Sequence, residues 1–295
     1  MFPLGRTTVA CVVLLVFGSA TFERVAQAKG RKKRERAAEA AAGNGESKHI
    51  VVTGVREPSG IALHPRLHHL FVVGDEGTVG EIDQDGRTIR ADPVSGNLED
   101  LAFHPGTGTF VLLSEKHAQL VVYDPVAHQE KRRIALETDA LLGQAPQVRK
   151  GQGFEGLAFR PQSGRPGGGV FYLAFQHSPP LVVAVAFDPD RAVTVGKDAV
   201  VGRWDLADRY HHLTAISYEP SLDRFLLIAD RRLVVLRSDG TTESESPRAL
   251  PLPHPEGVCL DESGAVWIVD DPSGLTRFAG GAASLTRPGE GGTSP

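Results

Sequence analysis

A pattern that recurs five times along the chain constrains the fold more than any other feature. Each copy opens a short strand with a polar or acidic residue and a small residue, passes a turn, and ends in a strongly apolar strand. The copies begin at Glu57, Asn97, Gly153, His212 and Pro255. Their small positions are 40, 56, 59 and 42 residues apart, and a four-stranded propeller blade needs roughly 40 to 50 residues. The pattern therefore predicts an all-β chain folded as a single β-propeller of five blades.

The segment before the first copy is expected to close the ring. Only three strands are predicted from the last copy, which ends near Phe278, whereas Lys48 to Val55 is an apolar segment with no other assignment. Used as the missing outer strand, it would remove the exposed edges that an open ring leaves. Six blades are the alternative, with residues 192–205 contributing to an extra blade within the 59-residue interval.

The first 28 residues predict export to the periplasm or cell envelope. Arg6 precedes an apolar run, and Ala26-Gln27-Ala28 is a small-residue pattern typical of cleavage after a signal peptide. The alternative is an uncleaved membrane anchor at residues 7–22, although an untilted span needs about 20 residues. We expect the mature chain to begin at or near Lys29.

The segments before and after the predicted propeller differ from it in amino-acid composition. Residues 29–47 predict a disordered basic and Ala/Gly-rich linker, whose basic run 29–36 could contact a membrane surface. Residues 48–280 form the predicted propeller, and residues 281–295, rich in Gly, Ser, Thr and Pro, predict a disordered tail.

The charge balance limits the class of binding partner, and the cysteine content limits disulfide formation. Residues 1–47 carry 8 basic and 4 acidic side chains, which leaves 24 basic and 32 acidic side chains for the rest. An acidic body argues against nucleic acid, and favours a divalent cation and a small molecule or envelope protein as partners of a monomer. Cys259 is the one cysteine beyond the predicted leader, so no internal disulfide is expected, and its apolar neighbours favour a buried thiol.

One face of the predicted propeller is densely acidic. The innermost strand of a blade and the next strand run in opposite directions, so the start of one and the end of the other share a face. The residues that open the innermost strands are Ser59, Glu99, Glu155, Thr214 and Glu256. The residues that end the second strands are Asp75, Glu115, Gln176, Asp230 and Asp271.

These residue types point to calcium chemistry. Crowded carboxylates raise one another's pKa or attract a cation, and Ca²⁺ takes roughly six to eight oxygen ligands. The five opening residues are therefore the candidate Ca²⁺ ligands, and the second set is a candidate surrounding rim. The alternatives are side-chain hydrogen bonds that lock neighbouring blades together, and simple solvation.

Catalytic residues stay unassigned, because the sequence lacks G-x-S-x-G, HExxH and paired CxxC motifs. His64-Pro65 and His104-Pro105 end innermost strands away from the acidic face and are typical of turns. The run Asp83-Gln84-Asp85-Gly86 starts like a calcium loop but lacks the downstream glutamate, and so predicts a hairpin turn.

The segments EPSGIALHP, KGQGFEGLAF and LPHPEGVCLDESGAVWIVDD resemble the SdiA-regulated (YjiK/CarP) β-propeller family. The resemblance covers Val55 to Phe278. It implies an exported or membrane-anchored propeller, linked in some relatives to calcium and to a phytase-like activity. Glu155 and Glu256 match the glutamates of the family's E-G openings, and Glu99 matches with an aspartate in place of the glycine.

The chain departs from the family pattern at three places, which are Ser59, Thr214-Ala215 and Gln176. These departures lower the number of carboxylates on one side of the predicted rim.

Two functions remain open. The first is a non-enzymatic envelope protein whose acidic rim binds Ca²⁺ or a partner in a binding or regulatory role. The second is a calcium-dependent hydrolase of phosphoester (phytase-like) or lactone type. Phosphate chemistry needs cationic side chains near the metal, and the rim offers only Lys116, Lys150 and Arg231, so the first function is favoured.

Overall fold

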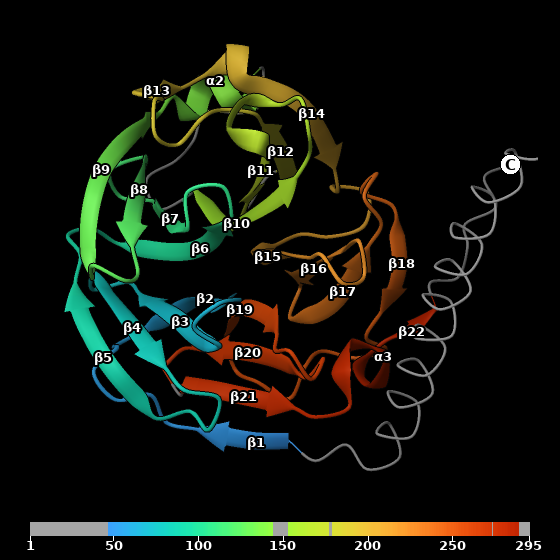
Figure 1. Cartoon of the computed structure of the whole chain (residues 1–295). Helices are drawn as coiled ribbons and strands as arrows, with labels where there is room; N and C mark the ends of the chain where they lie inside the picture. The colour runs from blue at the N-terminus through green and yellow to red at the C-terminus, as the bar shows by residue number, and fades with distance from the viewer. Residues whose placement is uncertain (1–46, 144–152, 177–178, 273, 289–295) are drawn as a thin grey trace, which may run out of the picture.

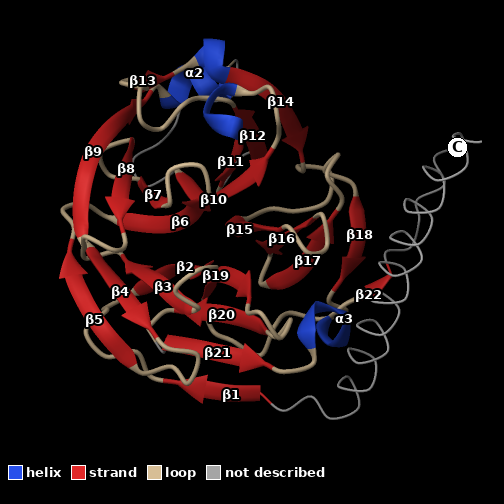
Figure 2. Cartoon of the chain, viewed as in Figure 1, coloured by secondary structure: helices blue, strands red, loops and turns tan. Residues whose placement is uncertain are grey.

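The computed structural model describes residues 47–143, 153–176, 179–272 and 274–288. Five sheets stand as blades around a central axis, and the first strand of each antiparallel meander is innermost (Figure 1). Strands make up almost all of the ring, and the short helices lie at its periphery (Figure 2). The chain is therefore an all-β propeller of five blades, which confirms the fold predicted from the repeat.

Each blade contains four strands in meander order, and two blades gain one more. Blade 1 comprises β2 (Pro58–His64), β3 (His69–Gly74), β4 (Thr78–Ile82) and β5 (Thr88–Pro93). Blade 2 comprises β6 (Leu98–His104), β7 (Thr109–Ser114), β8 (Gln119–Asp124), β9 (Gln129–Leu136) and the added β13 (Thr194–Val195). Blade 3 comprises β10 (Phe154–Pro161), β11 (Gly169–Phe175), β12 (Leu181–Val185) and β14 (Val200–Asp205).

The remaining two blades complete the ring. Blade 4 comprises β15 (Leu213–Glu219), β16 (Arg224–Ala229), β17 (Arg232–Leu236), β18 (Thr242–Glu245) and the added β22 (Arg287–Pro288). Blade 5 comprises β19 (Pro255–Leu260), β20 (Val266–Asp270), β21 (Gly274–Phe278) and β1 (Ser47–Ile50). Each innermost strand contacts the innermost strands of both neighbouring blades.

The core lies between blades rather than at a single centre. The second strands have long apolar runs because both faces of each are covered, and every residue of β11 is buried. Five hydrophobic clusters fill the five spaces between neighbouring blades. Because burial of apolar surface is the main stabilising term, each blade depends on its two neighbours.

The predicted hairpin turn joins β4 to β5. Gly86 has φ 87°, a left-handed conformation that glycine adopts without strain. The Asp83 carboxylate accepts the backbone N–H groups of Asp85 at 2.9 Å and Arg87 at 2.8 Å. This aspartate therefore stabilises the turn instead of forming a calcium loop.

The N-terminal strand closes the ring, as predicted. Strand β1 pairs antiparallel with β21, from Ser47 opposite Phe278 to Ile50 opposite Leu275. The strand is shorter than the segment predicted, because the chain leaves blade 5 and crosses toward blade 1 through Gly54, which has φ 84°.

The six-blade alternative is wrong, because residues 192–205 extend two existing blades. Strand β13 pairs in parallel with β9 of blade 2. Strand β14 pairs with β12 as the outer strand of blade 3.

The start of the predicted disordered tail is also structured. Helix α3 (Gly281–Leu285) packs Ala282 and Leu285 against the apolar cluster between blades 4 and 5, and β22 pairs with β18. A hydrogen bond between the hydroxyls of Ser244 and Thr286, at 3.0 Å, adds to these contacts. Residues 289–295 lie outside the described part of the chain.

The predicted signal peptide, anchor and most of the linker, residues 1–46, also lie outside the described residues. Within the part that the structure describes, no helix is long and apolar enough to span a membrane.

Candidate functional site

A β-bulge lies at the start of every innermost strand. In each blade the pairing of the first strand with the second skips one residue of the first strand. The skipped residues are Ser59, Glu99, Glu155, Thr214 and Glu256. A bulge leaves its extra residue outside the ladder and re-aims its side chain. The five candidate ligands thus occupy the same irregular position at one mouth of the channel, which we call the rim.

Hydrogen bonds connect the rim across blades 5, 1 and 2. The Ser59 hydroxyl donates to Asp75 Oδ1 at 2.5 Å and is also hydrogen-bonded to the Glu256 carboxyl of blade 5. The Asn97 amide donates to Glu99 Oε1 at 2.8 Å and is also hydrogen-bonded to Asp75. Side chains from three blades therefore form one polar network.

The network extends into blade 3 through Glu99 and Glu155. The carboxyl groups of these two glutamates are hydrogen-bonded to each other. Burial, and then the charge of Glu155, raises the pKa of Glu99 to about 10. Burial, and then the charge of Glu115, raises the pKa of Glu155 to about 7. Two carboxyl groups in contact require a proton or a cation between them, so the pair retains a proton at neutral pH when no cation is bound.

The same causes act on the other rim carboxyls. Burial, followed by the charges of Asp271 and Asp75, raises the pKa of Glu256 to about 8. Burial also raises the pKa of Asp75, while the hydrogen bond from Ser59 opposes this shift. The pKa of Glu115 is raised by burial and by the charge of Asp75. The charges that raise these pKa values come from neighbouring carboxylates, so the carboxyls of this mouth oppose one another's ionisation.

The blade 4 side of the rim is arranged differently. The Thr214 hydroxyl donates to the Pro255 carbonyl of blade 5 at 2.8 Å, which is the blade-locking alternative at this position. The Asp230 carboxylate accepts the His211 backbone N–H at 3.1 and 3.2 Å. Gln176 joins its neighbours through backbone hydrogen bonds. This is the side on which the sequence replaces carboxylates.

Asn97 is a rim residue that the sequence reasoning missed. It precedes the bulge of blade 2 and links Asp75 to Glu99. The available signal was its place at the opening of the second copy, two residues before a predicted ligand.

Asp100 closes the channel beneath the rim, a role that the sequence reasoning also missed. It occupies the position taken by Gly60, Gly156, Ala215 and Gly257 in the other innermost strands. Its side chain is fully buried and accepts the backbone N–H of Leu157 at 2.7 Å, in the next blade.

Two further backbone groups contribute to this contact. The N–H of Leu101 donates to the Asp100 carboxylate at 2.8 Å, and the N–H of Ile216 in blade 4 is also hydrogen-bonded to it. Burial nevertheless raises the pKa of Asp100 well above its ordinary value. A polar side chain at a glycine position was the sequence signal for this residue.

The rim supplies oxygen donors for a hard cation without a preassembled cage. Among the described residues, no three His, Cys, Asp or Glu side chains are already grouped as a metal site. Two observations still fit a cation: the contact between Glu99 and Glu155, and the buried Asp271 Oδ1, which has no hydrogen-bond partner among the described residues. An all-oxygen donor set suits Ca²⁺ better than a transition metal.

Comparison with known proteins identifies one matching family and several structures of similar fold. The model of the SdiA-regulated family matches residues 46–279. No curated protein matches the sequence.

Several solved structures are similar to this chain at low sequence identity. Myxococcus xanthus glutaminyl cyclase is 12% identical, with a TM-score of 0.53 over 82% of this chain and 95% of that one. A streptogramin B lyase is 10% identical, with a TM-score of 0.41 over 75% of this chain and 64% of that one. A nidogen/laminin complex is 13% identical, with a TM-score of 0.47 over 73% of each chain. The glutaminyl cyclase supports the propeller fold alone.

Proposed function

The chain belongs to the SdiA-regulated family, and from this premise we propose that it is an exported envelope protein whose acidic rim binds Ca²⁺ in a binding or regulatory role. The observation that carries the proposal is the contact between the carboxyl groups of Glu99 and Glu155. Like charges held together in a buried site are stabilised either by a shared proton or by a cation. A cation that displaces this proton would also be attracted by the neighbouring carboxylates.

The residues that would hold the ion are the three bulge glutamates, Glu99, Glu155 and Glu256, with Asp75 and Ser59 beside them. Carboxylate and hydroxyl oxygens are the ligands that Ca²⁺ prefers, and water completes its shell. Thr214 would contribute only by releasing the Pro255 carbonyl. The bound ion would compensate the mutual repulsion of the carboxylates, because it replaces a proton by two positive charges.

The hydrolase alternative has less support. A phosphoester substrate needs cationic side chains around the metal. The guanidinium of Arg231 instead donates to the Leu252 carbonyl at 2.6 Å, and Lys150 lies outside the described residues. A binding or regulatory role requires no such clamp.

Calorimetric titration of the purified propeller with Ca²⁺ tests the proposal. We expect binding that strengthens from pH 6 to pH 8, because the ion competes with protons on carboxyls whose pKa values are raised. Glu155→Gln should weaken binding at least tenfold. Asp85→Asn removes an exposed carboxylate in the β4–β5 turn and should leave the affinity unchanged. Equal heats and affinities in the wild type and Glu155→Gln would overturn the calcium proposal.

Export has a separate test. Mass spectrometry of the protein from envelope fractions should find a mature chain that begins at or near Lys29. Recovery of intact residues 1–28 in the membrane would favour the anchor.

A further inference from the structure

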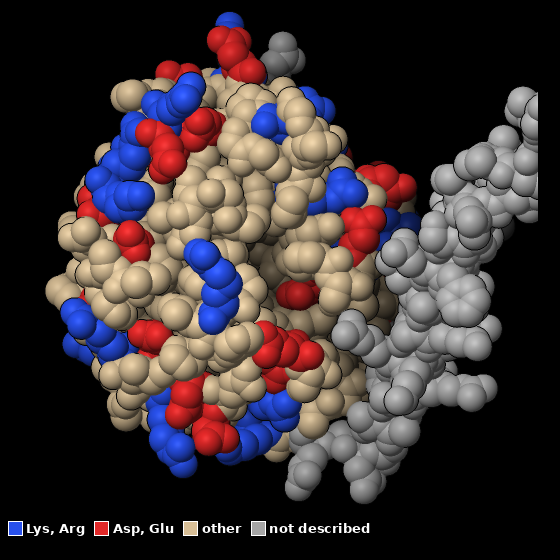
Figure 3. All heavy atoms as spheres, in the orientation of Figure 1, with Lys and Arg blue, Asp and Glu red and all other residues tan. Residues whose placement is uncertain are grey.

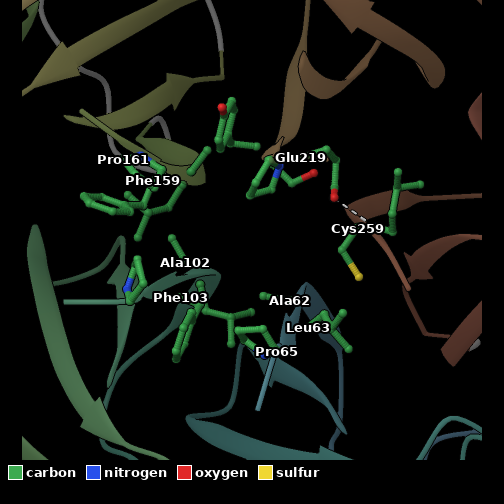
Figure 4. A pocket seen from close by; sticks show the side chains of 17 residues that line it. Ala62, Leu63, Pro65, Ala102, Phe103, Phe159, Pro161, Glu219 and Cys259 are labelled. Atoms are coloured by element: carbon green, nitrogen blue, oxygen red, sulfur yellow. Dashed lines mark hydrogen bonds between the residues drawn. The ribbon is translucent and has the colours of Figure 1, made fainter. Parts of the chain in front are cut away.

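A second site lies in the same channel, beyond Asp100. A cavity of about 230 Å³ opens between the final residues of the innermost strands, at the end opposite the rim (Figure 4). Figure 3 shows the centre of this face hollowed, with mostly uncharged surface around it, an acidic side chain within it and a basic side chain beside it. Leu101 and Leu157, next to the hydrogen-bonded Asp100, line this cavity. The Asp100 layer therefore separates it from the acidic rim.

The walls of the cavity are mostly apolar. Small side chains from four of the innermost strands line it at equivalent positions: Ala62, Ala102, Ala158 and Cys259. Phe103 and Phe159 add aromatic surface. Neither lysine nor arginine is among the described lining residues. This lining suits a ligand with an apolar body and offers no cationic side chain to a negative one.

Three polar side chains belong to the lining, and one of them, Tyr218, already donates its hydroxyl to Asp223 Oδ1 at 3.0 Å. Glu219 is the lining residue with a carboxyl group, and its Oε1 accepts the backbone N–H of Leu260 at 2.9 Å. Burial, with a smaller contribution from the charge of Asp261, raises the pKa of Glu219 to about 8. Ser217 Oγ is buried and has no hydrogen-bond partner among the described residues. In blade 4, serine thus replaces the alanine or cysteine that occupies the equivalent position in the other four blades.

We propose that this cavity binds a small organic ammonium ion with an apolar body, held by the Glu219 carboxylate and the Ser217 hydroxyl. The ammonium group would supply the positive charge that the cavity wall lacks and would donate hydrogen bonds to both oxygens. Its charge would also lower the raised pKa of Glu219, so that this carboxyl gives up its proton to solvent when the ligand binds at neutral pH. An apolar body fits the alanine, leucine and phenylalanine walls. A cavity of about 150 Å³ already holds benzene, so this one has room for a six-membered ring with a short aminoalkyl arm.

The Leu260 hydrogen bond gives Glu219 a structural role as well, because it joins blade 4 to blade 5. Glu219→Gln is therefore the informative substitution: its amide oxygen can still accept this N–H, while the negative charge is lost. The ammonium site depends on the charge and the blade contact does not, so ligand binding and folding respond differently.

Three probes of nearly one size separate charge recognition from simple filling of the cavity: benzylammonium, benzyl alcohol and benzoate. In NMR or calorimetric titrations of the full chain, we expect benzylammonium to bind at least tenfold more tightly than benzyl alcohol, and benzoate not to bind. Equal affinities for benzylammonium and benzyl alcohol would overturn the proposal, as would preference for benzoate.

Substitutions in the cavity wall test which residues hold the ammonium ion. Glu219→Gln should weaken benzylammonium at least tenfold and change benzyl alcohol binding less than twofold, whereas Glu262→Gln, an exposed carboxylate at the same end, should change neither. Ser217→Ala should weaken benzylammonium severalfold, which keeps the proposal testable if Glu219→Gln does not fold. Unchanged benzylammonium binding in a folded Glu219→Gln or Ser217→Ala variant would overturn it. None of these results depends on Ca²⁺ at the rim, so the two proposals fail separately.

Discussion

Replacing Asp100 by alanine tests how the channel is closed. The Asp100 carboxylate accepts the N–H groups of Leu157 at 2.7 Å and Leu101 at 2.8 Å, at a fully buried position. Asp100→Ala leaves both donors without this acceptor. An unsatisfied buried donor costs about 1–3 kcal/mol, so losing the acceptor of two donors should lower the free energy of unfolding by about 2–6 kcal/mol. That is a large share of the ~5–15 kcal/mol typical of a whole domain.

Asp100→Asn separates hydrogen bonding from charge. Both carboxylate oxygens accept backbone N–H groups, and an asparagine side chain would turn its own NH₂ toward one of these donors. We therefore expect a loss of about 1–3 kcal/mol even though the neutral side chain has almost the same shape.

Urea unfolding followed by tryptophan fluorescence measures both effects, because Trp267 is fully buried in blade 5. Asp85→Ala, at an exposed turn, is the matched control and should change stability by less than about 0.5 kcal/mol. If Asp100→Ala unfolds within about 1 kcal/mol of the wild type, the account of Asp100 as the closing contact is wrong.

The rim and the ring closure give two more predictions. For Glu155, a folded pKa of about 7 against an ordinary 4.5 means that its contribution to stability is present below pH 4.5 and is lost as pH rises toward 7. Glu155→Gln should therefore stabilise the cation-free protein at pH 8 by up to about 3 kcal/mol and have little effect at pH 4; equal unfolding free energies at pH 8 would contradict this. Removing residues 47–50 takes away the strand paired with β21 and should lower the thermal midpoint, since it exposes the edge of β21; an unchanged midpoint would rule out a closing role for β1.

The blade architecture could be predicted from the sequence because its signals are local. An apolar second strand, a turn and a small residue after a polar opening recur at blade spacing, and each copy folds into the same pair of strands. The rim positions followed from the same symmetry, as all five openings fall on equivalent bulges.

The connections between blades could not be predicted in this way. Asn97 reaches Asp75 of the neighbouring blade, and the Thr214 hydroxyl turns to the Pro255 carbonyl. Such partners are set by how closely two innermost strands approach, which a single repeat does not encode. The same limit hid the roles of Asp100, and of helix α3, whose apolar contacts come from blades 4 and 5.

The pairing between β1 and β21 also determines when the ring can close during synthesis and folding of the chain. Ser47 lies opposite Phe278, so the first strand of the ring to be synthesised must wait for one of the last. Such a non-local contact makes folding slow, because most of the chain must be in place before it can form. Until β21 has been synthesised, β1 has no partner strand. Once β21 is present, blade 5 keeps an unpaired edge until β1 joins it, and such an edge is a template for aggregation. A nascent or truncated chain that ends before β21 therefore cannot complete the ring, whatever the quality of its other four blades.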